Sequence, residues 1–185
     1  MGDGSGTDWL VRTAVEVDAA AIGELQVRSW RHSYRRIVPD PVLAGLDPAH
    51  SAGRWADHLR DGRFTVPLAV HPADSVLGAF CAVGAVRNEA RDGRTGVRTG
   101  ELYALYTDPR ALGRGAGPSA HGAGVDRLRT AGYRRAVLWV LTDNPRARAF
   151  YARHGWRCDE LVEREEHGGV PLPVVRYSRT LAPPG

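Results

Sequence analysis

The sequence contains no lysine and only two cysteines, and both shortages limit what the protein can be. All 25 basic residues are arginines, so the chain has no lysine side chain of its own to acylate. Cys81 and Cys158 are too few for a disulfide framework and lack the spacing of metal ligands. We expect both to be small core residues, because free cysteine is often buried. Histidines and carboxylates show no ligand spacing either, so no metal is expected.

Long apolar runs are also absent. The first apolar stretch, which follows Trp9, is interrupted by Arg12, Glu16 and Asp18. No later run reaches the roughly 18 apolar residues of a membrane span, and no secretion signal is apparent. We therefore expect a cytoplasmic protein that does not enter a membrane.

What the chain has is enough for one core. Its 185 residues are 43% hydrophobic and 25% charged, which fits a single domain, predicted over residues 9–181 with tails at 1–8 and 182–185. The net charge of +4 admits an anionic partner. Because the arginines are scattered and no aromatic–basic motif accompanies them, nucleic acid is not expected to be that partner.

The apolar periodicity predicts an alternation of strands and helices. Asp18 is the predicted N-cap of a first helix that carries Ile22, Leu25, Ser29 and Trp30 at helical spacing. Further helices are expected over 42–46, over 49–60, from the end of the glycine-rich turn to about residue 130, and over 144–154. Strands are expected over 9–14, 64–70, 76–86, 101–107, 136–141, 156–162 and 174–181, with a mobile loop over 88–99. This order predicts an α/β domain (an α+β mixed sheet) with helices packed on the sheet.

A glycine-rich loop, Asp108–Gly117, lies between a predicted strand and a predicted helix. Glycines let the backbone approach a ligand, and a helix N-terminus adds partial positive charge, so a phosphate could bind there without side-chain cations. Taken alone, the loop fits an ordinary glycine-rich turn as well.

A second motif decides between these interpretations. It reads Asn144-x-x-Ala147-x-x-Phe150-Tyr151-x-x-x-Gly155-Trp156 and follows an apolar strand. Together with Tyr106-Thr107-Asp108-Pro109, the glycine loop and a helix that closes in Ala131-Gly132-Tyr133, it resembles the GNAT acetyltransferase superfamily. The resemblance is specific over 101–156. Towards the N-terminus, Trp30-x-x-x-Tyr34 and Ile37-Val38-Pro39-Asp40 resemble an actinobacterial-like branch of that superfamily.

The chain departs from the family pattern in the glycine loop. When Tyr133 and Asn144 are aligned, Leu112 stands where the family usually has glutamine or arginine. Pro118 falls in the first turn of the following helix and removes one potential phosphate donor. Gly122 and Gly124 each weaken that helix by roughly 1 kcal/mol relative to alanine. These departures favour, as an alternative, a non-catalytic acyl-CoA-binding or regulatory module with the same fold.

The resemblance implies a mostly antiparallel, twisted sheet of about six to seven strands in which the fourth and fifth strands are parallel and splayed. It also implies an enzyme that transfers an acetyl group from acetyl-CoA to a primary amine of a small molecule or peptide. The cofactor would lie in the splayed gap and on the glycine loop. The residues that match the family's cofactor site are Leu105, Tyr106, Thr107, Leu112, Gly113, Arg114, Gly115, Ala116, Gly117, Asn144, Arg146 and Tyr151.

Two residues match catalytic positions of the family. Tyr151 matches the general acid, because a phenol with a pKa near 10 can protonate a departing thiolate of similar pKa. Its alternative role is that of a helix aromatic packed on the sheet. Glu101 matches a position where some members carry a general base, and its alternative role is that of a solvated carboxylate at a strand end.

Trp30 and Tyr34 would contact the acceptor, by stacking or by cradling its cation, or would anchor the covering loop. Glu163, Glu165 and Glu166 could attract a cationic amine, but a solvated charge run is the interpretation we favour. The last two strands could support a homodimer through a sheet edge. The acceptor itself stays open.

Overall fold

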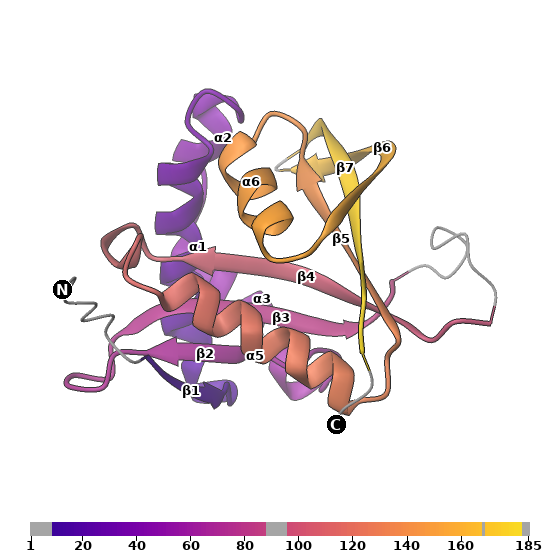
Figure 1. Cartoon of the computed structure of the whole chain (residues 1–185). Coiled ribbons are helices and arrows are strands. Elements are labelled where there is room, and N and C mark those ends of the chain that lie inside the picture. The colour runs from indigo at the N-terminus through magenta and orange to yellow at the C-terminus, as the bar shows by residue number, and fades with distance from the viewer. Residues whose placement is uncertain (1–8, 88–95, 168, 183–185) are drawn as a thin grey trace, which may run out of the picture.

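The computed structural model describes residues 9–87, 96–167 and 169–182, which form one sheet with helices on both faces (Figure 1). The strands are β1 Leu10–Thr13, β2 Pro67–Val70, β3 Leu77–Ala85, β4 Thr99–Thr107, β5 Arg135–Leu141, β6 Arg157–His167 and β7 Val170–Thr180. The helices are α1 Ala19–Ser33, α2 Asp40–Ala44, α3 Pro48–Arg60, α5 Ala116–Thr130 and α6 Pro145–Arg153, with 3-10 turns at Glu16–Asp18 and Pro109–Ala111.

The seven strands follow the order β1-β2-β3-β4-β5-β7-β6, and every neighbouring pair is antiparallel except β4 and β5. This confirms the predicted mixed sheet and its one parallel pair. The parallel pair arises because α5 carries the chain back across the sheet between β4 and β5, as a crossover between parallel strands requires.

The parallel pairing of β4 and β5 is short. It runs from Thr99 opposite Arg135 to Leu102 opposite Leu138 and then stops, although both strands continue. On its other side β4 stays paired with β3 as far as Thr107. The part of β4 from Tyr103 onward therefore has a strand neighbour on one side only.

A β-bulge at Tyr103 accompanies this parting. Ala104 pairs with Ala82 and Leu102 pairs with Val83, so Tyr103 is the extra residue of β4. A bulge disturbs the alternation of side chains along a strand. As a result Tyr103 and Ala104 both pack on the face that α1 and α3 cover, whereas Leu102 and Leu105 pack on the opposite face.

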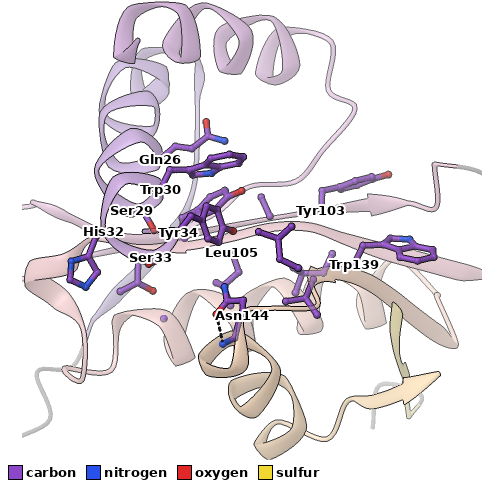
Figure 2. A pocket seen from close by; sticks show the side chains of 18 of the residues that line it. Gln26, Ser29, Trp30, His32, Ser33, Tyr34, Tyr103, Leu105, Trp139 and Asn144 are labelled. Carbon is purple, nitrogen blue, oxygen red and sulfur yellow. Dashed lines mark hydrogen bonds between the residues drawn. The ribbon is translucent and has the colours of Figure 1, made fainter. Parts of the chain in front are cut away.

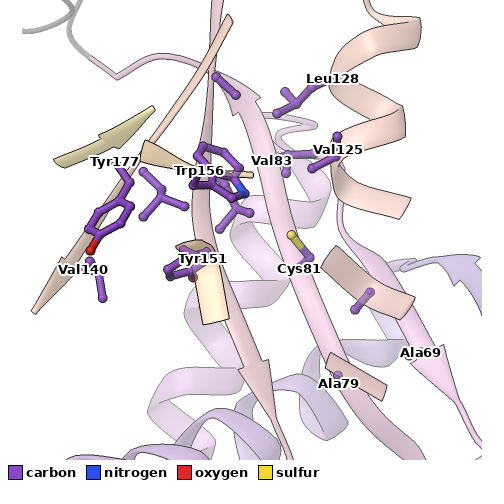
Figure 3. Close-up of a cluster of buried hydrophobic side chains, with 14 of the residues drawn as sticks. Ala69, Ala79, Cys81, Val83, Val125, Leu128, Val140, Tyr151, Trp156 and Tyr177 are labelled. Carbon is purple, nitrogen blue, oxygen red and sulfur yellow. The ribbon is translucent and has the colours of Figure 1, made fainter. Parts of the chain in front are cut away.

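Two apolar layers hold the helices to the sheet. In Figure 1 α5 crosses in front of the sheet, whereas α1 and α3 lie behind it. The front layer includes Cys81, Leu128, Tyr151 and Trp156, several of which Figure 3 shows, and the back layer centres on Phe80. No described helix is both long and apolar enough to cross a membrane.

The structure corrects two local predictions. Asp18 does precede α1, but its side chain caps no amide of that helix. Its backbone is already helical because a 3-10 turn leads into α1, whereas an N-cap needs extended backbone. The carboxylate instead accepts from the Val15 N–H at 2.8 Å and pairs with Arg12 at 2.6 Å. Cys81 is buried as predicted, but Cys158 is exposed, because β6 is the edge strand of the sheet.

Most predicted elements are present with shifted ends. The last two strands are longer than predicted, and β2 begins at Pro67 rather than at Phe64. Most of the predicted loop over 88–99 lies outside the described residues, as does the predicted tail over 1–8. A dimer through the β6 edge stays a prediction.

The glycines of α5 have opposite roles in packing. A Cβ at Gly124 would lie 2.7 Å from the Cys81 Sγ and 3.2 Å from a Val83 methyl group, so this glycine lets α5 approach β3 closely. A Cβ at Gly122 would meet nothing within 4 Å. Only Gly122 therefore weakens the helix without a gain in packing.

We accordingly expect opposite effects from two matched substitutions. Gly122→Ala should raise the free energy of unfolding by up to about 1 kcal/mol, through helix propensity alone. Gly124→Ala should lower it by about 1–3 kcal/mol, because the new methyl group overpacks the α5–β3 contact. Urea unfolding of both variants measures this, and a stabilised Gly124→Ala protein would contradict the packing argument.

Candidate active site

A groove of about 1320 Å³ runs across the molecule at the point where β4 and β5 part. Its walls come from α1 and α3 on one side and from the start of α5 and α6 on the other, with β6 at one end. Figure 2 shows Trp30 and Tyr34 of the α1 region facing this space, with Leu105 on its floor and Asn144 across from them. We call it the central groove.

The glycine loop forms one end of the central groove. Gly113 and Gly115 have φ angles of 75° and 90°, a region that side chains disfavour. These two residues and Gly117 line the groove just before and within the first turn of α5, where N–H groups have no acceptor inside the helix. Pro118, the third residue of α5, has no N–H to offer. The loop can therefore bind an anion through its backbone, with one donor fewer than an ordinary helix start.

Trp9 braces this loop from behind. Its indole Nε1–H donates to the Arg114 carbonyl oxygen at 2.7 Å, and its ring lies against Gly78 and Gly115. This contact joins residues that are 105 positions apart in the chain. Sequence reasoning assigned Trp9 only to a strand, because nothing local indicates such a partner.

Asp108 fixes the other end of the loop to α1 and to the turn after β4. The side chain is almost fully buried and accepts a hydrogen bond from the Arg110 backbone N–H at 2.9 Å. It also pairs with the guanidinium groups of Arg28 at 2.9 Å and of Arg110 at 3.0 Å. Burial raises the pKa of Asp108, but the hydrogen bonds from Arg110 and Arg28 outweigh it and bring that pKa down to about 2. The carboxylate thus stays ionised at any ordinary pH.

The free edge of β4 forms the floor of the central groove. Leu105, Tyr106 and Thr107 line it, and their backbone groups on the β5 side have no strand partner. Asn144 lies opposite, where its Oδ1 caps α6 by accepting from the Ala147 N–H at 3.0 Å. The structure thus gives Asn144 a structural task, and its side-chain amide lines the groove as well.

Tyr151 is buried on α6 and lines the groove beside this floor. Burial raises its pKa well above the ordinary value of 10, and the nearby Cys81 and Tyr106 add to the rise. Its ring packs near Trp156 and Tyr177, at centroid distances of 6.1 and 6.4 Å. Tyr151 is therefore packed as a helix aromatic and also lines the groove, and its role as the general acid stays a prediction.

A buried histidine, His121, packs near Tyr151. His121 accepts a hydrogen bond at Nε2 from the Trp156 indole at 2.9 Å, and burial lowers its pKa to about 3. An uncharged imidazole therefore packs near Tyr151, at a centroid distance of 6.5 Å. Sequence reasoning did not single out His121, since a lone histidine in a helix carries little positional information.

Glu101 is buried rather than solvated. Its carboxylate accepts from the Arg87 backbone N–H at 2.9 Å and pairs with the Arg87 guanidinium at 2.5 Å, and it is not among the residues that line the groove. Arg87 also reaches Glu165 at 3.5 Å. In this structure the carboxylate of Glu101, the predicted base, is therefore engaged in an ion pair with Arg87.

The aromatic residues of α1 form a cluster at the groove. Trp30 and Tyr34 make an edge contact at 4.8 Å, and Trp30 lies 6.4 Å from Tyr106. Burial raises the pKa values of Tyr34 and Tyr106. Both predicted substrate contacts line the groove and also pack against the α2 region, so the anchoring role is present in the structure.

Comparison of the sequence with known proteins identifies the family to which the chain belongs. The family model described as Acetyltransferase (GNAT) family matches residues 21–156. The uncharacterised N-acetyltransferase YuaI of Bacillus subtilis is 31% identical over 165 residues, which cover 89% of each chain. This chain belongs to the GNAT acetyltransferase family.

Further relatives agree with this assignment. A mycothiol acetyltransferase of Cellulomonas flavigena is 32% identical over 93% of this chain, which spans only 61% of that relative. The structure of the PaiA N-acetyltransferase of Thermoplasma acidophilum in complex with coenzyme A has a TM-score of 0.69 at 18% identity, and covers 92% of this chain and 98% of its own. At that identity the likeness concerns the fold.

The structure brings together most of the residues that the GNAT resemblance had predicted. Those that line the central groove are Trp30, Tyr34, Leu105, Tyr106, Thr107, Leu112, Gly113, Gly115, Gly117, Asn144, Arg146 and Tyr151. Arg114, Ala116 and Glu101 do not line it. Ala116 is fully buried at the start of α5, so only its backbone N–H could serve a ligand.

Several groove residues were not predicted. Arg87, Tyr103 and Trp139 line the groove, and so does Glu165, which sequence reasoning treated as part of a solvated run. The side chain of Glu165 is only 21% exposed, because it pairs with Arg87 across 78 residues. In the described parts of the chain, no cluster of histidine, cysteine and carboxylate could hold a metal.

The Asp108 network predicts a pH-dependent contribution to stability. Asp108→Asn should lower the free energy of unfolding at pH 7 by about 1–2 kcal/mol. Because the folded pKa lies below the ordinary 3.8, this stabilisation is fully present above the ordinary value and disappears as the pH falls through about 2.

Urea unfolding of the wild type and the variant across this range measures the difference. Asp126→Asn is the matched control, since Asp126 forms an exposed ion pair with Arg129 and should contribute little. Equal losses in both variants would contradict the role of Asp108.

Proposed function

We propose that the protein is an N-acetyltransferase that moves the acetyl group of acetyl-CoA to a primary amine of a small molecule or peptide, by direct attack in a ternary complex. The observation that carries the proposal is the unpaired edge of β4 beside the glycine loop and the buried Tyr151. The coenzyme A held by the Thermoplasma relative supports a cofactor of the same kind here.

The residues suit each part of the cofactor. The backbone of Gly113–Gly117 and the N-terminus of α5 would bind the pyrophosphate, since both present N–H groups and partial positive charge. Arg146, which is exposed at the groove, would add a side-chain cation. The pantetheine arm would extend along the free edge of β4 and complete, in effect, the interrupted sheet.

The chemistry then proceeds at the β4 floor. A neutral amine attacks the thioester carbonyl, and a β4 backbone N–H near Leu105 or Tyr106 stabilises the oxyanion. The carbon–sulfur bond breaks as the tetrahedral intermediate collapses, and the thiolate takes the proton of the Tyr151 hydroxyl. The amine loses one proton during the reaction, which restores the phenol through solvent. The raised pKa keeps Tyr151 protonated, and proton transfer requires that the same burial also raises the basicity of the thiolate formed beside it.

Calorimetry with acetyl-CoA, followed by thiol release in an amine screen, tests the function. We expect one-site binding in the micromolar range, about −8 kcal/mol, and thiol release that requires an amine. Binding without release for any amine would favour the non-catalytic module that Leu112 and Pro118 had suggested. No binding at all would contradict both.

Removal of the Tyr151 hydroxyl tests the acid. Tyr151→Phe should lower kcat by about tenfold or more while leaving the affinity for acetyl-CoA in place. Tyr133→Phe is the matched control, because Tyr133 stacks with Arg98 outside the groove. Full turnover in Tyr151→Phe would refute the proposed acid.

Glu101 completes the proposal as the base that removes the amine proton, directly or through a water molecule. Since Arg87 holds its carboxylate, the bound acceptor has to draw Arg87 away first. Glu101→Gln should lower kcat/KM by about tenfold or more. An unchanged kcat/KM in Glu101→Gln would contradict the role as base and leave Glu101 only its ion pair with Arg87.

A further inference from the structure

One wall of the central groove carries two arginines that form no ion pair with a described carboxylate, although Asp47 at the start of α3 also lines the groove. His50, Arg54 and His58 of α3 line it, followed by Arg63 just after the helix. Within the described residues Arg54 and Arg63 form no ion pair, although many other arginines of the chain do. Burial, Arg54 and Arg63 lower the pKa of His58 in spite of the nearby Asp57 and Asp61.

The opposite end of the same space is acidic. Glu165 and Glu166 of β6 line it, and Glu101 lies buried behind Arg87. Arg87 is shared by two carboxylates, those of Glu101 and Glu165, and Glu166 adds a further negative charge at this end of the groove. The carboxylates are therefore only partly compensated by the protein itself.

An aromatic floor joins the two charged ends. The rings of His58 and Phe64 lie 4.9 Å apart, those of Phe64 and Tyr103 lie 4.4 Å apart, and the Arg87 guanidinium lies 5.3 Å from the centre of the Tyr103 ring. Figure 2 shows Tyr103 and Trp139 on the same side of the groove. The Tyr103 hydroxyl donates to the Ala85 carbonyl, which fixes the ring in the floor.

This arrangement is dipolar, and a simple amine would match only half of it. The ammonium group of a simple amine would be attracted to the carboxylates at the β6 end. At the α3 end, Arg54 and Arg63 would then have no anion to bind. A guanidinium group binds a carboxylate or a phosphate-type anion through two parallel hydrogen bonds. An acceptor that carries both charges would satisfy both ends and align its amine along the floor.

We propose, on the basis of the proposed function, that the acceptor is a zwitterion: an amine that also carries a carboxylate or a phosphonate-like anion. The anion binds between Arg54 and Arg63, the apolar part lies on Phe64 and Tyr103, and the amine lies near Glu165. This specificity is separate from the transfer chemistry, because none of these side chains touches the proposed cofactor positions at the glycine loop.

A matched panel of acceptors tests the proposal. Each of a set of ω-amino acids, whose amine and carboxylate are separated by chains of increasing length, is compared with its amide, which lacks the anion, and with its aminophosphonate analogue. The readout is thiol release from acetyl-CoA. We expect the two anionic forms to exceed the amide in kcat/KM by about tenfold or more. A preference between carboxylate and phosphonate identifies the anion.

Two variants locate the preference. In Arg54→Ala/Arg63→Ala the ratio of acid to amide kcat/KM should fall by about tenfold, mainly through KM. Arg60→Ala is the control, because Arg60 pairs with Glu16 and Asp57 outside the groove, and it should keep the wild-type ratio. Both sites are exposed, so the variants should fold, and acetyl-CoA calorimetry checks that they do.

The outcomes separate this inference from the proposed function. Amides accepted as well as acids, or a preference that survives in the double variant, overturn the zwitterion while leaving the acetyltransferase. A protein that binds acetyl-CoA and acetylates other amines but none of the zwitterions overturns it also. Failure to bind acetyl-CoA is seen before any acceptor is added and overturns the proposed function instead.

Discussion

The parting of β4 from β5 after Leu102 and Leu138 is the constraint on which the site depends. Unpaired backbone groups inside a sheet are costly unless a ligand or water satisfies them. Here the unpaired edge runs along Leu105–Thr107, at the centre of the molecule and beside the start of α5. The bulge at Tyr103 accompanies the opening and brings Tyr103 and Ala104 to the same face. The gap thus presents unpaired backbone groups to the groove.

The two halves of the central groove are built by different means. The cofactor half relies on backbone N–H groups, which the glycine loop positions and which Trp9 and Asp108 hold in place. The half that we propose for the acceptor is lined by side chains from α3, β4 and β6, such as Arg54, Tyr103 and Glu165. Backbone geometry is common to a fold, whereas side chains vary freely on it. This explains why likeness to other GNAT proteins says much about the cofactor and little about the acceptor.

Burial and charge also divide between these halves. Around Tyr151 the neighbours are apolar or uncharged, including His121 with its pKa of about 3, and this environment favours the protonated phenol. Around Arg87 the neighbours are carboxylates, and the guanidinium stays charged between Glu101 and Glu165. One groove therefore contains a phenol that burial keeps protonated and an ion network around Arg87.

The sequence by itself determined the order of elements, the glycine loop and the second motif, because these depend on periodicity and on spacing between near neighbours. It named Gly115, Asn144 and Tyr151, which the tertiary structure places along one groove. It missed the pairing of Arg87 with Glu165, the indole of Trp9 on the Arg114 carbonyl and the exposure of Cys158. Each of these depends on which strands become neighbours and which lies at the edge, and contacts across 78 or 105 residues leave no local signal. The opposed effects of Gly122 and Gly124 were decided in the same way, since only the packed sheet reveals which glycine has a strand against it.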